Sequence, residues 1–355
     1  MTRVRYTSFL VVVLPALMVG GCIDPLSFES QKAQGQLVVS GKIHDGPGPY
    51  YLALGMTTTE NTLPLPEAGA SITLFNDRGE QEDYVETENE GHYMVPGNII
   101  NGTRGDTYHI EIELRDGRTF SSLPETMPMH SGKDALILEP TRYEYRTPLG
   151  TVVDAEGIYI YSDTHIPEHN EPLFLKWDLE SLYLFREMEP LSSLGPAAKT
   201  CFVTESINPQ HISLYSTRDS PIDTIERHFL GIKDVIPDQF YIRHYVNVIV
   251  SSVTERRYTY WQKVDQVINQ TGTVFDVAPA TAPGNIRDER GDVTEAFGYF
   301  EAAAMDTSRA LIMKFDLETY IQNPCPTVFG PIRRSVCGNC LELENSTLER
   351  PPYLQ

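Results

Sequence analysis

The stretch HIPEH, residues 165–169, is the part of the chain that most resembles a catalytic motif. It matches the H-x-x-E-H order of a group of zinc proteases, in which two histidines bind zinc and the glutamate acts on the bound water. That chemistry requires both histidines on one face of a helix, and Pro167 would break such a helix. We therefore expect an inter-strand loop here. A loose surface metal site at His165, His169 and Asp163 is the weaker alternative.

No other stretch of the sequence matches a catalytic or cofactor-binding pattern. The chain has no G-x-S-x-G elbow, no P-loop, no Rossmann glycine fingerprint and no EF-hand loop. The acidic stretch DERGDVTE, residues 288–295, lacks the ligand spacing of a calcium loop. We therefore predict no catalytic residue, no metal ligand and no cofactor.

The first 22 residues predict a lipoprotein signal. Arg3 and Arg5 precede the apolar run FLVVVLPALMV. This run is shorter than the ~20 residues that a membrane-spanning helix needs. It ends at VGGC, which has the small residues and the cysteine of a lipobox. We expect residues 1–21 to be cleaved, Cys22 to be acylated and residues 22–35 to act as a polar tether. The alternative is an ordinary export signal, with Cys22 in a disulfide.

Four further cysteines predict disulfides. An even number of cysteines in an exported chain favours pairing, and three connectivities are open. We favour a C-terminal segment, residues 325–340, that is stapled to itself and to a strand that starts at Cys201. Such closure would contribute roughly 3 to 5 kcal/mol. Zinc bound by four thiolates, or a redox pair in CGNC, is the weaker alternative. The cysteines concerned are Cys201, Cys325, Cys337 and Cys340.

The charge of the chain excludes some classes of partner. The formal net charge is -21, and 41% of the residues are hydrophobic. The apolar content is enough for packed cores and argues against disorder. The acidic balance argues against nucleic acid, whose phosphates require basic patches. Solubility is the simplest meaning of the charge, and an acidic cation site is the alternative.

Residues 36–128 carry the pattern of an immunoglobulin-like β-sandwich. In the clearest stretch, Tyr108, Ile110, Ile112 and Leu114 alternate with polar residues, which predicts a strand with one buried face. Asp116-Gly117 then predicts a hairpin turn. About seven short strands with frequent turn signals are typical of such sandwiches.

A Pro-rich polar stretch, SLPETMPMHSGKD, predicts the linker to a second β-rich domain over residues 135–345. The whole chain is therefore predicted to be all-β, with a larger β-sandwich-like domain after the first sandwich. One face of a strand in this domain carries Leu173, Leu175, Trp177 and Leu179.

One helix is predicted in this domain, at about residues 253–269. Ser252 and Glu255 have the spacing of a capping box. A stripe at helical spacing predicts a face packed on a sheet, and an aromatic ligand platform is the alternative. The stripe consists of Tyr258, Trp261, Val264 and Ile268.

Several of these stretches together resemble a known family. They are the lipobox followed by CIDP, the opening strands LVVSGKIHDGPGPYYLALG, the segment RRYTYWQKVDQ with GTVFDVAPATAPGNI and AFGYF, and the ending CGNC. The chain resembles a family of Bacteroidota lipoproteins catalogued as domain of unknown function 4249. The resemblance implies an outer-membrane lipoprotein, often encoded beside TonB-dependent receptors of the SusC type. It implies no catalytic residue.

These observations together predict a non-enzymatic lipoprotein. We expect lipid anchoring in the outer membrane through Cys22, at the cell surface or the periplasmic face. The expected partners are a TonB-dependent receptor and an unidentified ligand, and no nucleic acid. One alternative is a structural or adhesive surface protein. A second is a hydrolase in the larger domain. A large exposed aromatic patch would favour ligand capture over adhesion.

Overall fold

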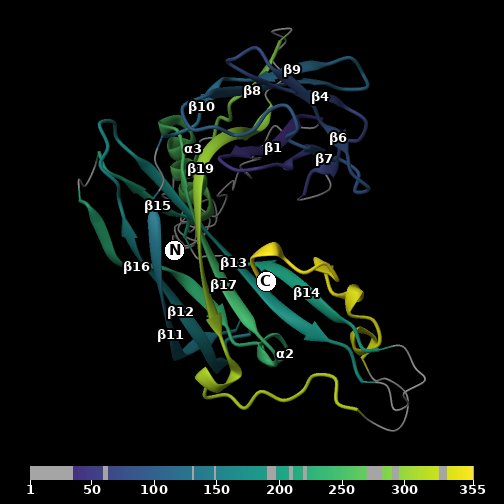
Figure 1. The fold of residues 1–355 in the computed structure, drawn as a ribbon, viewed down its shortest axis with the longest axis vertical. Helices are drawn as coiled ribbons and strands as arrows, with labels where there is room; N and C mark the ends of the chain where they lie inside the picture. The colour runs from purple at the N-terminus through teal and green to yellow at the C-terminus, as the bar shows by residue number, and fades with distance from the viewer. Residues whose placement is uncertain are drawn as a thin grey trace, which may run out of the picture.

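The computed structural model describes most of the chain after the predicted tether. The described residues are 35–58, 63–129, 132–147, 149–189, 197–207, 211–218, 222–269, 282–289, 296–327 and 334–354. The predicted signal and Cys22 lie outside them, as do Asp292 and Glu295 of the acidic stretch. The described residues form three β-sheets and few helices, which confirms the predicted all-β class (Figure 1).

The N-terminal part is a two-layer sandwich. One layer belongs to the large sheet and contains β1 (Leu37–His44), β2 (Tyr50–Met56), β3 (Leu65–Pro66), β6 (Val85–Glu86) and β7 (His92–Val95). The other layer contains β4 (Ser71–Asn76), β5 (Gln81–Asp83), β8 (Thr107–Glu113), β9 (Thr119–Ser122), β10 (Glu125–Thr126) and β18 (Ile286–Asp288).

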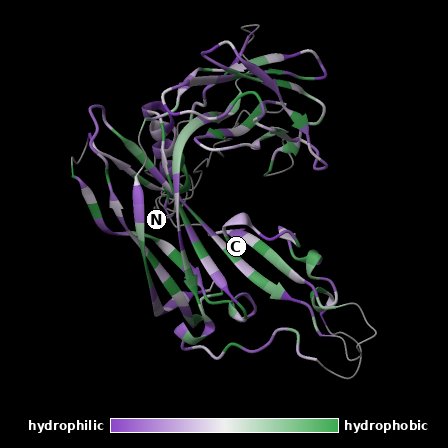
Figure 2. Cartoon of the chain, viewed as in Figure 1, coloured by the Kyte–Doolittle hydropathy of each residue, from purple (hydrophilic) through white to green (hydrophobic). Residues whose placement is uncertain are grey.

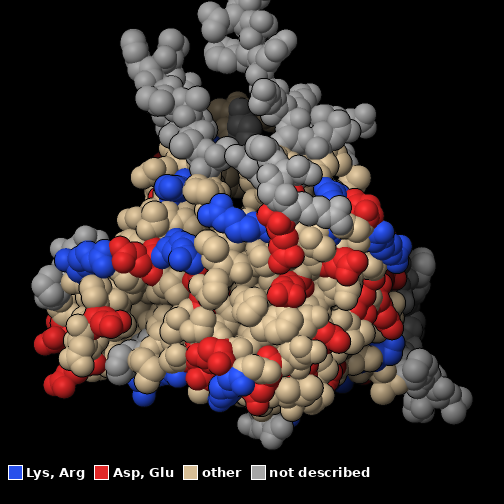
Figure 3. Space-filling model, turned by 90° about the horizontal axis from the view of Figure 1, so that it is seen from above, with Lys and Arg blue, Asp and Glu red and all other residues tan. Residues whose placement is uncertain are grey.

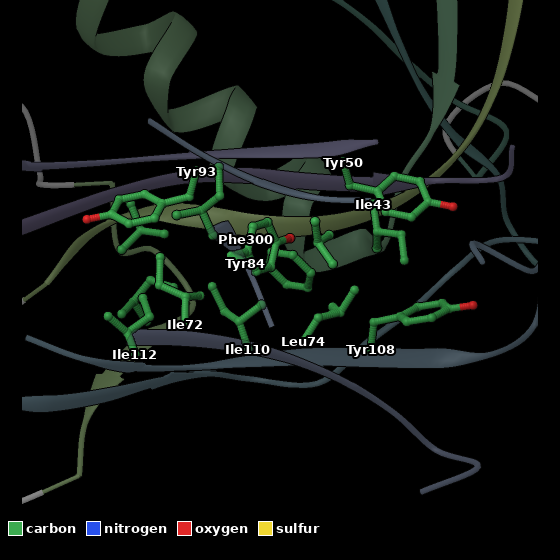
Figure 4. Close-up of a cluster of buried hydrophobic side chains, with 14 of the residues drawn as sticks. Ile43, Tyr50, Ile72, Leu74, Tyr84, Tyr93, Tyr108, Ile110, Ile112 and Phe300 are labelled. Carbon is green, nitrogen blue, oxygen red and sulfur yellow. The ribbon is translucent and has the colours of Figure 1, made fainter. Parts of the chain in front are cut away.

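The core of this sandwich confirms the predicted alternation in β8. Tyr108, Ile110 and Ile112 are buried, and the residues between them are not. Figure 4 shows side chains of the two layers meeting, with Tyr50 and Phe300 opposite Leu74 and Ile110. β8 and β9 form the predicted hairpin, and Gly117 takes a left-handed φ of 82° in its turn.

The sandwich is completed by strands from much later in the chain. β18 pairs with β9, and β19 (Phe297–Ile312) runs parallel to β1. Phe300, Ala302 and Ala304 of β19 lie in the core of the first sandwich. The stretch predicted as the linker, residues 122–134, contains β10 of this sandwich before the chain leaves it, and the chain later returns to the sandwich. Parallel pairing joins distant segments, so no local pattern signals it.

β19 also runs into the second part of the molecule (Figure 1). There the large sheet continues through β17 (His244–Ser252), β13 (Phe174–Arg186), β14 (Thr200–Ser206), β15 (Ser213–Ser216) and β20 (Ser346–Thr347). A separate three-stranded sheet contains β11 (Lys133–Arg146), β12 (Val152–His165) and β16 (Thr224–Asp234).

The two sheets of the second part enclose a core of their own. Leu175 and Trp177 of β13 pack with Ile158 and Ile160 of β12. The predicted apolar face of β13 is confirmed, because Leu173, Leu175, Trp177 and Leu179 are all buried. Figure 2 shows hydrophobic and hydrophilic residues alternating along many of the strands. This alternation leaves the opposite face of the three-stranded sheet outside the core.

The predicted helix is α3 (Glu255–Asn269), but its cap differs from the prediction. Thr254 caps it, since its Oγ1 accepts a hydrogen bond from Arg257 N at 3.2 Å. Ser252 is instead the last residue of β17, and its buried hydroxyl has no hydrogen-bond partner. The strand extends this far because Ser252 pairs with both Leu175 and Ala304.

The predicted stripe of α3 is only partly buried. Tyr258 packs against Phe174, whereas Ile268 is 64% exposed. The first turns of the helix pack on the sheet, and farther along Asp265 accepts a hydrogen bond from Ile212 N at 2.8 Å, but Ile268 stays exposed. A single turn, α2 (Pro237–Phe240), precedes β17. No helix among the described residues is long and apolar enough to cross a membrane.

The C-terminal segment is held by two disulfides. Cys325 pairs with Cys337, and Cys340 pairs with Cys201 in β14. The two cysteines of CGNC therefore bond to different partners. The described chain after β19 contains the short 3-10 helices η2 (Lys314–Asp316), η3 (Ser335–Cys337), η4 (Cys340–Glu342) and η5 (Pro352–Leu354).

Candidate functional site

The outer face of the three-stranded sheet carries a group of aromatic side chains. Ile158 and Ile160 of β12 point into the core, so the alternation of the strand turns Tyr159 and Tyr161 outward. β16 places Phe229 beside Tyr161. We call the outward group the aromatic face; it consists of Tyr143, Tyr145, Tyr159, Tyr161 and Phe229.

The rings of the aromatic face contact one another and remain accessible. The ring centroid of Phe229 lies 5.7 Å from that of Tyr159 and 5.5 Å from that of Tyr161. The rings of Tyr143 and Tyr145 lie 6.1 Å apart. Phe229 is 46% exposed and Tyr145 is 47% exposed. Large apolar side chains exposed together mark an interaction surface more often than scattered ones do.

A glycine sets the position of Tyr143. A Cβ atom at Gly157 would lie 2.8 Å from Cε1 of Tyr143 and 2.9 Å from Cγ2 of Ile232. The missing side chain lets the Tyr143 ring lie across β12, where its hydroxyl donates to the Asp234 carboxylate of β16. Burial, together with this carboxylate, raises the pKa of Tyr143, so the phenol remains a neutral donor.

One edge of the aromatic face is hollowed. A cavity of about 380 Å3 is lined by Tyr143, Tyr145 and Phe229, with Ile232 and Asp234 of β16. His211 and Ser213, which precede and begin β15, close another side. The cavity thus combines flat apolar rings with a carboxylate, an imidazole and a hydroxyl, a combination typical of ligand sites.

The other rim of the aromatic face is charged. The Arg227 guanidinium lies 4.5 Å from the centroid of the Tyr161 ring and pairs with Glu139 at 2.7 Å. This arrangement can bind and orient a ligand through ring stacking and hydrogen bonds. The Tyr143 hydroxyl donates to the Asp234 carboxylate, but the pKa of this phenol is raised, so it stays protonated and is a poor nucleophile.

The HIPEH residues do not come together in this structure. His165 ends β12 and is exposed, and His169 Nδ1 lies 2.9 Å from the carbonyl oxygen of Pro167. The Asp163 carboxylate accepts a hydrogen bond from Arg227 N at 2.6 Å. Among the described residues, no three His, Cys, Asp or Glu side chains are arranged to hold a metal ion. The motif thus lies at a strand end followed by a loop, as its proline predicts.

The sequence contained a signal for the aromatic face that could not be interpreted alone. RYEYR and GIYIYSD both place tyrosines at alternate positions. Residues at alternate positions of a strand lie on the same face, but the alternation does not show whether that face is buried. Only the packing of Ile158 and Ile160 against Trp177 turns the tyrosines outward.

The surface charge is mixed where Figure 3 shows it. Acidic and basic side chains are interspersed over this view from above, and its described residues form no broad basic area (Figure 3).

Comparison with known proteins identifies one relationship. A family model described as Domain of unknown function (DUF4249) matches residues 23–309, which is more than half of the chain. No curated protein matches the chain.

Proposed function

The chain belongs to the DUF4249 family, and from this premise we propose that it is a non-enzymatic outer-membrane lipoprotein that captures a ligand for a TonB-dependent transporter. The lipobox at Cys22 supports the anchor, since a cysteine directly after a short apolar signal is the acceptor of lipid. Disulfides in the body of the chain fit an oxidising compartment outside the cytoplasm.

The aromatic face is the observation that supports ligand capture over adhesion. An adhesive or purely structural surface needs no hollow, whereas here Tyr143, Tyr145 and Phe229 line a cavity beside exposed rings. Aromatic rings that are exposed to water are less favourable than buried ones. A group of exposed rings therefore favours a surface that a ligand covers.

A glycan chain is the ligand class that fits this face best. A sugar ring has a flat carbon-bound face that can lie on a tyrosine or phenylalanine ring, and hydroxyls at its edge. Asp234 and Ser213 offer hydrogen-bond partners next to the rings of the cavity. Several rings in a row suit a chain of sugars better than a single one.

Titration of soluble oligosaccharides tests the ligand class. Isothermal titration calorimetry of the detergent-solubilised chain against maltoheptaose, xylohexaose, mannohexaose and chitohexaose should give binding to at least one. Phe229→Ala or Tyr161→Ala should weaken it at least about tenfold, equivalent to ~1.4 kcal/mol. Tyr320→Ala is the control, since Tyr320 is 82% exposed and lies outside the aromatic face. Binding that neither aromatic-face variant weakens would contradict the proposal.

Recovery of partners tests the transporter role separately. A C-terminally tagged copy is isolated from native membranes in mild detergent, and its partners are identified by mass spectrometry. A TonB-dependent barrel in stoichiometric amount is the expected result. A folded and lipidated protein recovered alone would overturn the accessory role and leave adhesion as the better explanation.

A further inference from the structure

The cavity at the edge of the aromatic face carries a negative charge. Its titratable lining residues are Asp234, His211 and the phenols of Tyr143 and Tyr145. None of the described residues that line it is a lysine or an arginine. At about pH 8, where phenols and imidazoles are ordinarily neutral, the charge of the lining is that of the Asp234 carboxylate.

The Asp234 carboxylate has no cationic partner within the described part of the chain. Its Oδ1 accepts a hydrogen bond from the Tyr143 hydroxyl, which is a neutral donor. The neighbouring Lys233 is buried on the opposite side of β16, where its Nζ lies 3.3 Å from Oε2 of Glu205. Because Asp234 is exposed, water solvates it in the free protein, and a ligand cation can reach it.

The other rim of the aromatic face already holds a cation of the chain itself. There the Arg227 guanidinium lies over the Tyr161 ring and pairs with the Glu139 carboxylate. Arg227 has a left-handed φ of 48°, and its backbone N–H is held by the Asp163 carboxylate at 2.6 Å. The fold thus maintains an uncommon backbone conformation where a cation meets a ring and a carboxylate.

The cavity repeats this combination without the cation. The rings of Tyr143, Tyr145 and Phe229 line it beside the Asp234 carboxylate. In the described ranges, no lysine or arginine lies over any of these three rings, whereas Arg227 covers Tyr161. A group of aromatic rings with a carboxylate is the usual arrangement for recognition of an ammonium group.

The shape of the cavity also fits a compact group. The ring planes of Tyr143 and Tyr145 are inclined at 37°, so these rings form two walls and not one flat platform. The volume of about 380 Å3 is at the small end of ligand sites. A methylated or sugar-borne ammonium group is a compact cation of this kind.

We propose that this cavity selects a ligand with an ammonium group, which lies among the rings of Tyr143, Tyr145 and Phe229 and pairs with the Asp234 carboxylate. This inference rests on the proposed ligand capture at the aromatic face and adds the charge of the ligand. A neutral sugar leaves Asp234 without a counter-charge, and an anion is repelled by it. The formal net charge of -21 also favours the approach of a cation.

Choline and 3,3-dimethylbutan-1-ol test the charge, because they have the same shape and differ in whether the central atom is a cationic nitrogen or a carbon. The detergent-solubilised chain is titrated with each at about pH 8 and constant ionic strength, and binding is followed by ligand-observed NMR. Choline should bind at least about tenfold more tightly than the neutral alcohol. Equal binding of the two, or no choline binding at ~10 mM, overturns the proposal.

Asp234→Asn tests the role of the carboxylate. Asparagine still accepts a hydrogen bond from the Tyr143 hydroxyl, so the variant removes the charge and keeps the ring in place. The preference for choline over the alcohol should fall at least about threefold, as expected for an exposed ion pair. Glu144→Gln is the matched control, since Glu144 is exposed and alternates with the two tyrosines, on the opposite face of β11. A preference that Asp234→Asn leaves intact would overturn the assignment.

Oligosaccharides distinguish the source of the ammonium group. Glucosamine hexamer and chitohexaose differ in whether the nitrogen is a free amine or acetylated, and they are compared at about pH 6, where such amines are protonated. A preference for the amine form that Asp234→Asn reduces assigns an amino-sugar chain. Choline binding without this preference assigns a small quaternary amine. Neutral oligosaccharides that bind while choline does not would uphold glycan capture and overturn the ammonium site, so the two proposals can fail separately.

Discussion

Lys42 and Glu301 are register partners on the parallel strands β1 and β19, with Nζ and Oε1 3.0 Å apart. β1 opens the first sandwich and β19 is the last long strand of the described chain. The pair therefore joins the two ends of the fold, at a buried place where an unpaired charge would be costly.

Removal of the charge of Glu301 should destabilise the fold strongly. Glu301→Gln leaves Lys42 and Arg257 without their carboxylate, and breaking a buried pair costs about 3–5 kcal/mol. Urea denaturation followed by circular dichroism measures the change. The control is Glu318→Gln, since the Arg142–Glu318 pair is 64% and 70% exposed. Equal effects of the two substitutions would contradict this account of the buried pair.

Acid should weaken the fold partly through His244. This residue of β17 is stacked on Phe240, with ring centroids 4.0 Å apart. Burial and the Lys233 cation lower its pKa from 6.5 to about 3. The unfolded chain thus binds a proton that the folded chain excludes, so stability is fully present above pH 6.5 and is lost as the pH falls toward 3.

His244→Phe should remove part of this loss, because phenylalanine cannot titrate. Denaturation midpoints at about pH 7 and about pH 5 measure the difference. A smaller loss should remain, since burial also lowers the pKa of His44 and of His228. An unchanged pH dependence in the variant would show that His244 is already charged or exposed in the folded state.

The disulfides should contribute unequally to stability. Cys201–Cys340 spans 139 residues and Cys325–Cys337 spans 12. In the chain-entropy model, the longer loop contributes roughly 5 kcal/mol and the shorter one about 3 kcal/mol. Cys201→Ser with Cys340→Ser should therefore cost more than Cys325→Ser with Cys337→Ser in a denaturation experiment. Non-reducing peptide mapping is the check on pairing, and a peptide linking Cys337 to Cys340 would contradict it.

Gly298 should tolerate no side chain. Its φ is 87°, and a Cβ atom there would lie 1.9 Å from the carbonyl oxygen of Val39. Gly298→Ala should prevent β19 from pairing with β1 and cost well over the ~1–2 kcal/mol of left-handed strain alone. Gly79→Ala is the matched control, with φ 80° and nothing within 4 Å of its Cβ. The melting temperatures of the two variants are compared. A similar loss in both would mean that left-handed backbone strain alone explains the effect of Gly298→Ala.

Local pattern predicted the parts of this fold that depend on neighbours in sequence. The alternation from Tyr108 to Ile112 identified β8, and the face of Leu175 and Trp177 identified β13. Pro167 excluded a helical zinc motif. Helix α3 was predicted to within two residues at its start, but its cap was assigned to Ser252 because β17 reaches that residue only through pairing with two other strands.

Tertiary structure decided the rest, since the candidate site depends on contacts between distant segments. The two tyrosine pairs became an exposed face only because Ile158 and Ile160, which alternate with Tyr159 and Tyr161, pack in one core with Trp177. The Lys42–Glu301 pair joins two strands that lie far apart in the sequence, and no spacing along the chain relates the two residues. Periodicity records which side chains share a face, whereas burial, parallel pairing and the grouping of charges are set by what packs against that face.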